Sequence, residues 1–295
     1  MAVGAKHGGH ERRGLAEGCS VNDEATVFVP GHITGFFTIS EDDDPTKAGS
    51  QGAGLALSDG VTVTVQAADE RAIYLDDTSI EVEAVERVLD ALAADVLVDA
   101  ESALPLGAGF GVSGALALGA ALATNQVLDR GLSENELITI AHGAEVQAGT
   151  GLGDVVAQAK GGIPIRLEPG GPQHNVVDEV PSRVRVEYLH FDELSTESVL
   201  EESGELLNDA GEKALSLLVR EPTLSSFIYA SRGFAREAEL LTPQVGEVID
   251  DVSAADGQAS MAMLGETVFA LGTGLSDAGY DPEHCNTYPA GAVFK

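Results

Sequence analysis

A glycine-rich segment, Pro105-Leu-Gly-Ala-Gly-Phe-Gly-Val-Ser-Gly-Ala115, separates an expected strand over 96–100 from an Ala- and Leu-rich helix predicted over 113–128. Glycines let the backbone adopt positive φ and approach a ligand closely. Consecutive N–H groups at a helix N-terminus attract anions. The segment therefore predicts a cradle for the phosphates of a nucleoside triphosphate, with the Ser113 hydroxyl near a metal ion or a phosphate oxygen. The alternative is a helix cap whose glycines only permit close packing.

This segment differs from two common nucleotide-binding loops. A Walker A loop ends in Gly-Lys-Ser or Gly-Lys-Thr, and the segment contains no Lys. Gly109, Gly111 and Gly114 have the GxGxxG spacing of a dinucleotide-binding loop, but there the helix leads into a second strand. Here the chain passes from the helix into another helix, capped by Ser133. An oxidoreductase that binds a dinucleotide would require a strand at that point.

A second segment, residues 141–154, carries acidic side chains. His142 and Glu145 are three residues apart and share one face of a predicted helix, although such a pair more often packs or faces solvent than binds a metal. Asp154 follows closely spaced glycines on a loop shaped for ligand approach, or it caps the next helix. An anion cradle, a hydroxyl and two carboxylates together are what phosphoryl transfer requires: phosphate binding, Mg²⁺ ligands and a group that takes the proton of the nucleophile.

Composition excludes two classes of partner. The chain has 48 acidic and 16 basic residues among 295, and its formal net charge is −32. Such a field repels nucleic acids and anionic membranes, whereas 44% hydrophobic residues suffice for a folded core. Self-repulsion destabilises a compact chain unless salt screens it. We interpret the composition as an adaptation to a salt-rich cytoplasm; the alternative is an acidic protein kept soluble by its charge.

Targeting signals are not expected. Residues 1–24 are rich in glycine without apolar periodicity, and they predict a flexible N-terminal extension and no signal peptide. The apolar stretch from Ala115 to Ala123 is too short to span a bilayer. Cys19 and Cys285 belong to no CxxC pair, which favours a reduced compartment. The sequence therefore predicts a cytoplasmic protein.

Strands and helices mix without strict alternation, which favours an α+β fold. A break at Pro169-Gly-Gly-Pro172 separates an expected N-terminal domain, residues 25–175, from an expected C-terminal α+β domain, residues 176–295. The predicted strands are 26–29, ending at Pro30-Gly31, then 61–65 with 73–75 at hairpin distance, 96–100, 163–167 and 183–188. The predicted helices are 82–92, 113–128, two that begin near Ser133 and Asp154, several between 192 and 250, and one around 266–278.

Three motifs resemble those of the GHMP kinases, the galactose, homoserine, mevalonate and phosphomevalonate kinase family. Residues 105–115 resemble the family's phosphate loop, P-x-x-x-G-L-G-S-S-A, with Ser113 at the second Ser. Residues 29–35 resemble the N-terminal motif that opens with Pro-Gly, and Asp154 resembles the catalytic aspartate that follows a glycine-rich loop. The C-terminal Gly-Ala-Gly motif is degenerate, and its best candidate is residues 260–270.

The resemblance implies the two-domain α+β GHMP kinase fold, with the active site in the cleft between the domains. It also implies ATP and Mg²⁺ as cofactors and often a homodimer. Within the family, the motifs are most similar to the archaeal branch that phosphorylates the 4-hydroxyl of (R)-pantoate on the route to coenzyme A. Kinases for homoserine, shikimate or mevalonate are alternatives, as is a catalytically silent nucleotide or metabolite sensor on the same fold.

The same resemblance implies roles for single residues. Asp154 would accept or orient the proton of the hydroxyl, while Ser113 and Glu145 would take part in catalysis by holding Mg²⁺. Arg166 would pair with the substrate carboxylate through its planar guanidinium, or it would form a salt bridge at the surface. His32 would line the substrate pocket, or it would be an ordinary loop histidine. The phosphate cradle would consist of Pro105, Gly107, Ala108, Gly109, Gly111, Ser113 and Gly114.

Overall fold

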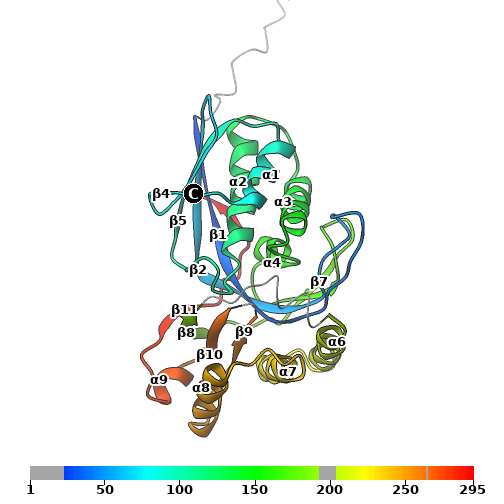
Figure 1. The fold of residues 1–295 in the computed structure, drawn as a ribbon, viewed down its shortest axis with the longest axis vertical. Helices are drawn as coiled ribbons and strands as arrows, with labels where there is room; N and C mark the ends of the chain where they lie inside the picture. Colours follow the sequence, from blue (N-terminus) through cyan, green and yellow to red (C-terminus); the bar gives the residue numbers. More distant parts are fainter. Residues whose placement is uncertain (1–22, 193–203, 264) are drawn as a thin grey trace, which may run out of the picture.

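The computed structural model describes residues 23–192, 204–263 and 265–295. They form an α+β fold in two parts, each of which combines one sheet with its own helices (Figure 1). Of the expected extension over 1–24, residues 1–22 lie outside the described residues, and Glu24 already begins a strand. None of the described helices is long and apolar enough to cross a membrane.

The first part contains an eight-stranded sheet in the order β12-β1-β2-β5-β3-β4, to which β6 and β7 are attached through β2. Helices α1 to α4 cover one face of this sheet (Figure 1). The strands are β1 (Glu24–Phe37), β2 (Gly52–Ala67), β3 (Ala72–Leu75), β4 (Thr78–Ser79), β5 (Val96–Ser102), β6 (Pro164–Glu168), β7 (Val176–Glu179) and β12 (Val293–Phe294). The helices are α1 (Glu83–Ala91), α2 (Val112–Val127), α3 (Glu134–Ala148) and α4 (Asp154–Lys160).

Helix α2 is the centre of this part, because it packs on β1 and β2 and is flanked by α1 and α3. Its side chains are therefore buried nearly all round, which explains the Ala- and Leu-rich composition. Gly119 lets α2 pack closely on the sheet, because a Cβ at this position would lie 2.5 Å from Val63 Cγ2. Helix α3 begins as predicted with a capping box between Ser133 and Glu136. It follows α2 directly, so the strand that a dinucleotide-binding unit requires after that helix does not occur here.

The second part contains a four-stranded sheet in the order β11-β8-β10-β9. Its strands are β8 (Arg185–Asp192), β9 (Gln258–Ala262), β10 (Glu266–Leu271) and β11 (Glu283–Asn286). The helices of this part are α6 (Gly204–Arg220), α7 (Leu224–Glu237), α8 (Pro243–Ala254) and α9 (Gly274–Asp277). The helical patterns predicted between 192 and 250 are confirmed over α6 to α8, and residues 193–203 lie outside the described chain.

Two predictions about the first sheet are wrong. Strand β1 does not end at Pro30-Gly31 but continues to Phe37, with a register shift at this dipeptide. Proline lacks a backbone N–H and cannot donate a hydrogen bond to the neighbouring strand. The register shift at this point accommodates the missing bond. Residues 73–75 do not form a hairpin with residues 61–65. They lie in β3, which pairs parallel with β5, because β5 already occupies that edge of β2.

The prediction of a helix around 266–278 is also wrong, because this segment forms β10 followed by the short helix α9. Strand β10 lies between β8 and β9, and Val268, Phe269 and Ala270 are all buried. A strand covered on both faces has a continuous apolar run instead of alternation, and periodicity cannot distinguish such a run from a buried helix.

The chain crosses between the two parts more than once. After residue 175, β7 still pairs with β6, and at the C-terminus β12 returns to pair with β1. Both strands therefore belong to the first sheet although they follow the break at 169–172. The division at residues 175 and 176 stays a prediction.

Candidate active site

The glycine-rich segment forms a loop that leads into α2. Gly107, Gly109 and Gly111 have φ angles of +80°, +83° and +64°, values that favour glycine. Gly111 is the N-cap of α2, without a capping side chain. Among the described residues, no protein group accepts a hydrogen bond from the backbone N–H groups of residues 107–111. These donors lie at the positive end of the helix dipole, where an anion would satisfy them.

The carbonyl groups of the same loop, by contrast, are held by the protein. Ala108, Phe110 and Gly111 each accept a hydrogen bond through the carbonyl oxygen. The respective donors are the Thr267 hydroxyl at 2.9 Å, the backbone N–H of His32 at 2.9 Å and the Gln158 side-chain amide at 2.8 Å. A loop fixed through its carbonyls keeps its N–H groups free for a ligand.

The loop lies where the two parts of the molecule meet. The Phe110 ring packs edge-on against Tyr188 of β8, with ring centroids 4.9 Å apart. Gly265 lies so close to Ala108 that a Cβ on Gly265 would collide with the Ala108 carbonyl. The degenerate motif at 260–270 therefore contacts the phosphate loop through Gly265. Of the other residues predicted for the cradle, Pro105 and Gly107 are exposed, and Gly114 is buried in the first turn of α2.

Ser113 and Glu145 are brought together as predicted. The Ser113 hydroxyl donates to Oε1 of Glu145 at 2.5 Å, and the Thr150 hydroxyl donates to the same oxygen at 2.8 Å. Burial raises the pKa of Glu145 to about 7, against the effect of these two hydrogen bonds. Gly151 leaves the room for this carboxylate, because a Cβ on it would collide with Oε2. His142 makes a different contact: its Nε2–H donates to the Ala48 carbonyl at 2.9 Å.

The chemistry of this pair fits Mg²⁺, which prefers oxygen ligands and is commonly held by one or two protein groups together with phosphates and water. A hydroxyl and a carboxylate beside a phosphate loop are such groups. The described residues contain no cluster of three or more His, Cys, Asp or Glu side chains suited to a metal.

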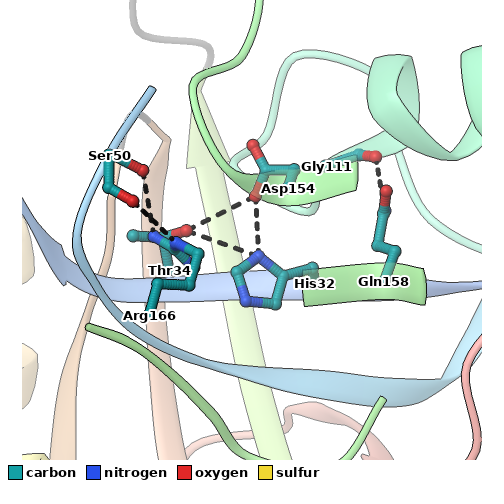
Figure 2. A network of polar contacts seen from close by, with 7 residues as sticks. All are labelled: His32, Thr34, Ser50, Gly111, Asp154, Gln158 and Arg166. Carbon is teal, nitrogen blue, oxygen red and sulfur yellow. Dashed lines mark hydrogen bonds and ion pairs between the residues drawn. The ribbon is translucent and has the colours of Figure 1, made fainter. Parts of the chain in front are cut away.

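Asp154 is the first residue of α4 and does not cap it, because the N-cap is Gly153. Its Oδ1 lies 2.6 Å from Nδ1 of His32 and accepts a longer hydrogen bond, 3.4 Å, from the Thr34 hydroxyl (Figure 2). Burial alone would raise the pKa of Asp154, but the His32 hydrogen bond and the nearby positive charge of Arg166 hold it below its usual range. The carboxylate is therefore ionised at neutral pH.

Arg166 projects from β6 beside Asp154 and is only 2% exposed, which contradicts the alternative of a surface salt bridge. Its Nε and Nη2 donate to the Ser50 carbonyl and hydroxyl at 3.4 and 3.3 Å (Figure 2). Nη1 is buried and has no hydrogen-bond partner among the described residues. Gly153 leaves space for the Arg166 guanidinium, because a Cβ on this glycine would lie 2.6 Å from Nε. A buried cation with an unpaired N–H is suited to bind a carboxylate.

Helix α4 joins these groups to the phosphate loop. Asp154 packs against Gly111, whose Cβ, if present, would lie 3.4 Å from the Asp154 carboxyl carbon. One turn later Gln158 donates to the Gly111 carbonyl, as Figure 2 shows. Gln158, Thr34 and Ser50 were not predicted from the sequence as site residues. The spacing of four residues from Asp154 was a usable signal for Gln158, and Thr34 lies within the motif at 29–35, whereas Ser50 is distant in sequence from every motif and carried no signal.

Comparisons with known proteins show which family the chain belongs to. Residues 80–162 match the family described as GHMP kinases N terminal domain. The pantoate kinase of Methanocaldococcus jannaschii is 35% identical over 252 residues, which cover 83% of this chain and 92% of the relative. That of Thermococcus kodakarensis is 34% identical over 261 residues, covering 83% and 86%.

Solved structures show the same relationship. A structure described as a phosphotransferase related to the CoA biosynthesis pathway superposes with a TM-score of 0.83 at 30% identity, over 92% of this chain and 98% of the other. Homoserine kinase from Cytophaga hutchinsonii superposes with a TM-score of 0.69 at 18% identity, over 95% and 100% of the two chains, and shows likeness of fold alone.

Proposed function

Because this chain belongs to the pantoate kinases of the GHMP kinase family, we propose that it phosphorylates the 4-hydroxyl of (R)-pantoate with ATP in the synthesis of coenzyme A. The product would be 4-phosphopantoate. One observation supports this most strongly: the buried Arg166 guanidinium, with its unpaired N–H, and the ionised Asp154 carboxylate lie beside a loop of free backbone N–H groups. An anionic alcohol and a nucleotide phosphate chain complement these three features.

The nucleotide would be bound through its phosphates. The free N–H groups of residues 107–111 and the start of α2 would contact phosphate oxygens. Ser113 and Glu145 would hold Mg²⁺, which neutralises charge on the phosphates when it is bound. Burial, and to a smaller extent the nearby charge of Asp154, raise the pKa of Glu145, and a cation held by this carboxylate would favour its ionised form.

Asp154 would act on the acceptor. Its ionised carboxylate accepts or orients the proton of the 4-hydroxyl while the oxygen attacks the γ-phosphorus and the bond to ADP breaks. Arg166 would hold the pantoate carboxylate, and Ser50 would fix the guanidinium through its Nε and Nη2 atoms. Intact Ser113, Glu145 and Asp154 favour turnover over a catalytically silent sensor.

Binding of the acceptor carboxylate by Arg166, the carboxylate clamp, would select alcohols that carry a carboxylate. Homoserine, shikimate and mevalonate also carry a carboxylate, so Arg166 does not distinguish pantoate from them. The preference for pantoate rests on relatives 34–35% identical over most of the chain. We further propose a salt-rich cytoplasm as the setting, supported by the net charge of −32, and a homodimer, supported by the family resemblance.

A coupled assay for ADP with pantoate, homoserine, shikimate and mevalonate, in molar KCl with Mg²⁺, tests this proposal. We expect turnover with pantoate and little with the other three acids. Arg166→Ala should mainly raise KM for pantoate and should matter far less for the uncharged analogue pantoyl alcohol. Preferred turnover of another acid would contradict the choice of acceptor, and equal losses with both pantoyl compounds would contradict the carboxylate clamp.

A further inference from the structure

His32 is buried in the contact between β1 and α4. Its side chain is 0% exposed, and its ring faces Asp154, which lies 122 residues later in the chain (Figure 2). The ring edge at Nε2 is closed by the backbone of Gly54, because a Cβ on that glycine would collide with Nε2. A substrate therefore cannot reach the imidazole as the protein is folded. Whatever His32 contributes to the reaction must pass through Asp154.

The contacts define the protonation state of His32. Nδ1 is 2.6 Å from an ionised carboxylate oxygen and so carries a proton, which it donates. Nε2 is buried and has no hydrogen-bond partner among the described residues. A second proton there would bury both a charge and an unpaired donor, which is costly. Burial lowers the pKa of His32 despite the contact with Asp154. The imidazole is therefore neutral, with its proton on Nδ1.

This contact leaves the two oxygens of Asp154 in different states. Oδ1 accepts from His32 and, at longer range, from Thr34. Oδ2 receives no hydrogen bond from any described residue, and the Asp154 side chain is 24% exposed. One oxygen is anchored inside the protein, and the other is available at the surface of the site.

We propose that His32 is a positioning residue whose Nδ1–H anchors Oδ1 of Asp154 and thereby presents Oδ2 to the acceptor hydroxyl. This inference deepens the proposed function and rests on it for the identity of the acceptor. In the transfer, Oδ2 takes the hydroxyl proton as the bond between oxygen and γ-phosphorus forms. The electron pair of the breaking bond leaves with ADP, and His32 keeps its proton throughout.

The surroundings of Asp154 make His32 the directional partner of this carboxylate. Arg166 contributes positive charge without a hydrogen bond to Asp154 within the described residues, and Glu145 contributes repulsion when ionised. Loss of the Nδ1–H donor would therefore free the carboxylate to rotate and raise its pKa. The groups that face Asp154 are His32 and Thr34 from β1, Arg166 from β6 and Glu145 from α3.

Three variants separate positioning from a purely structural role. His32→Asn places an amide N–H near the position of Nδ1, His32→Gln carries its amide toward Nε2, and His32→Leu has no donor. We expect kcat of His32→Leu to fall about 10- to 100-fold, as for other small misplacements of a reacting group. The acid limb of its pH profile should move to higher pH, while KM for ATP stays within about twofold.

Rescue by the conservative variant is the decisive comparison. His32→Asn should recover most of kcat and the original acid limb, whereas His32→Gln should resemble His32→Leu. Wild-type kcat and pH profile in His32→Leu, or no advantage of Asn over Leu, would overturn the proposal.

Nitrogen NMR of the intact protein provides a test that does not depend on folding of the variants or on the acceptor. The His32 ring should show the neutral Nδ1–H form at pH 7, and an Nε2–H form or an imidazolium would overturn the proposal. If the wild type fails to phosphorylate pantoate, the proposed function is contradicted, while the NMR result still decides the contact with Asp154.

Discussion

The two carboxylates of the site, Glu145 and Asp154, have opposite environments. Burial raises the pKa of Glu145 to about 7, whereas His32 and Arg166 hold that of Asp154 low despite burial. Carboxylates whose pKa values are moved apart commonly divide the work of a site. Here the difference suits Glu145 to a cation and Asp154 to an acceptor proton.

The role of Asp154 is tested by Asp154→Asn. Asparagine keeps the shape and can still accept from His32, and Gly153 rather than Asp154 caps α4, so we expect near-normal melting temperature and ADP affinity. Turnover should fall by at least about 100-fold, because loss of a general base typically costs about 10²–10⁴. Asp129→Asn is a matched control for the lost charge, at an exposed position whose φ of +46° suits asparagine. Normal turnover in Asp154→Asn would remove the mechanism.

The raised pKa of Glu145 predicts that the stability of the metal-free protein depends on pH. Its pKa is about 7 in the fold and 4.5 ordinarily, so between these values the folded state binds more protons than the unfolded state. Stability should therefore fall as pH rises from 4.5 to 7, by no more than about 3.4 kcal/mol. Denaturant unfolding in EDTA, compared with Glu145→Gln, isolates this contribution, because surface carboxylates titrate in both proteins. If the plots of unfolding free energy against pH for the two proteins stay parallel, the raised pKa of Glu145 is contradicted.

At the scale of elements, the sequence predicted α1 from its period, α3 from its capping box, and α2, α4 and strand β5 from the glycine-rich segments that border them. It failed at Pro30-Gly31, at the partner of β3 and at β10, where pairing between distant segments decided the outcome. The site followed the same division. Ser113 and Asp154 were singled out by the glycine-rich loops before them and Glu145 by its place on a predicted helix and by the family resemblance, but the contact of His32 with Asp154 depends on where β1 meets α4.

Gly153 tests the geometry at the start of α4. Gly153→Ala places a Cβ 2.6 Å from Nε of Arg166 and 2.5 Å from the Ser50 hydroxyl, so the guanidinium must move. We expect KM for pantoate to rise at least about tenfold, as for loss of an oriented charged contact, while KM for ATP changes little. Gly246→Ala in α8 is the control, because a Cβ there meets nothing within 4 Å and should add up to about 1 kcal/mol of stability. An unchanged KM for pantoate in Gly153→Ala would place the carboxylate elsewhere.

The whole molecule carries −32 over 295 residues, and repulsion between its surface carboxylates opposes folding. The screening length shortens from about 30 Å at 0.01 M salt to about 3 Å at 1 M. We therefore expect melting temperature and kcat to rise steadily across this range of KCl at fixed Mg²⁺. A melting temperature that is flat over the range would contradict the interpretation of the composition as an adaptation to salt.

The candidate site lies where the two parts of the molecule meet, because the phosphate loop contacts Tyr188 and Gly265 of the second part while Asp154, His32 and Arg166 belong to the first. Identification of the product tests this account most directly. Phosphorus and proton NMR of wild-type enzyme with ATP and (R)-pantoate in molar KCl should show one phosphate ester, coupled to the protons on carbon 4, formed in step with ADP. An ester on the 2-hydroxyl, or ADP released with inorganic phosphate alone, would contradict it.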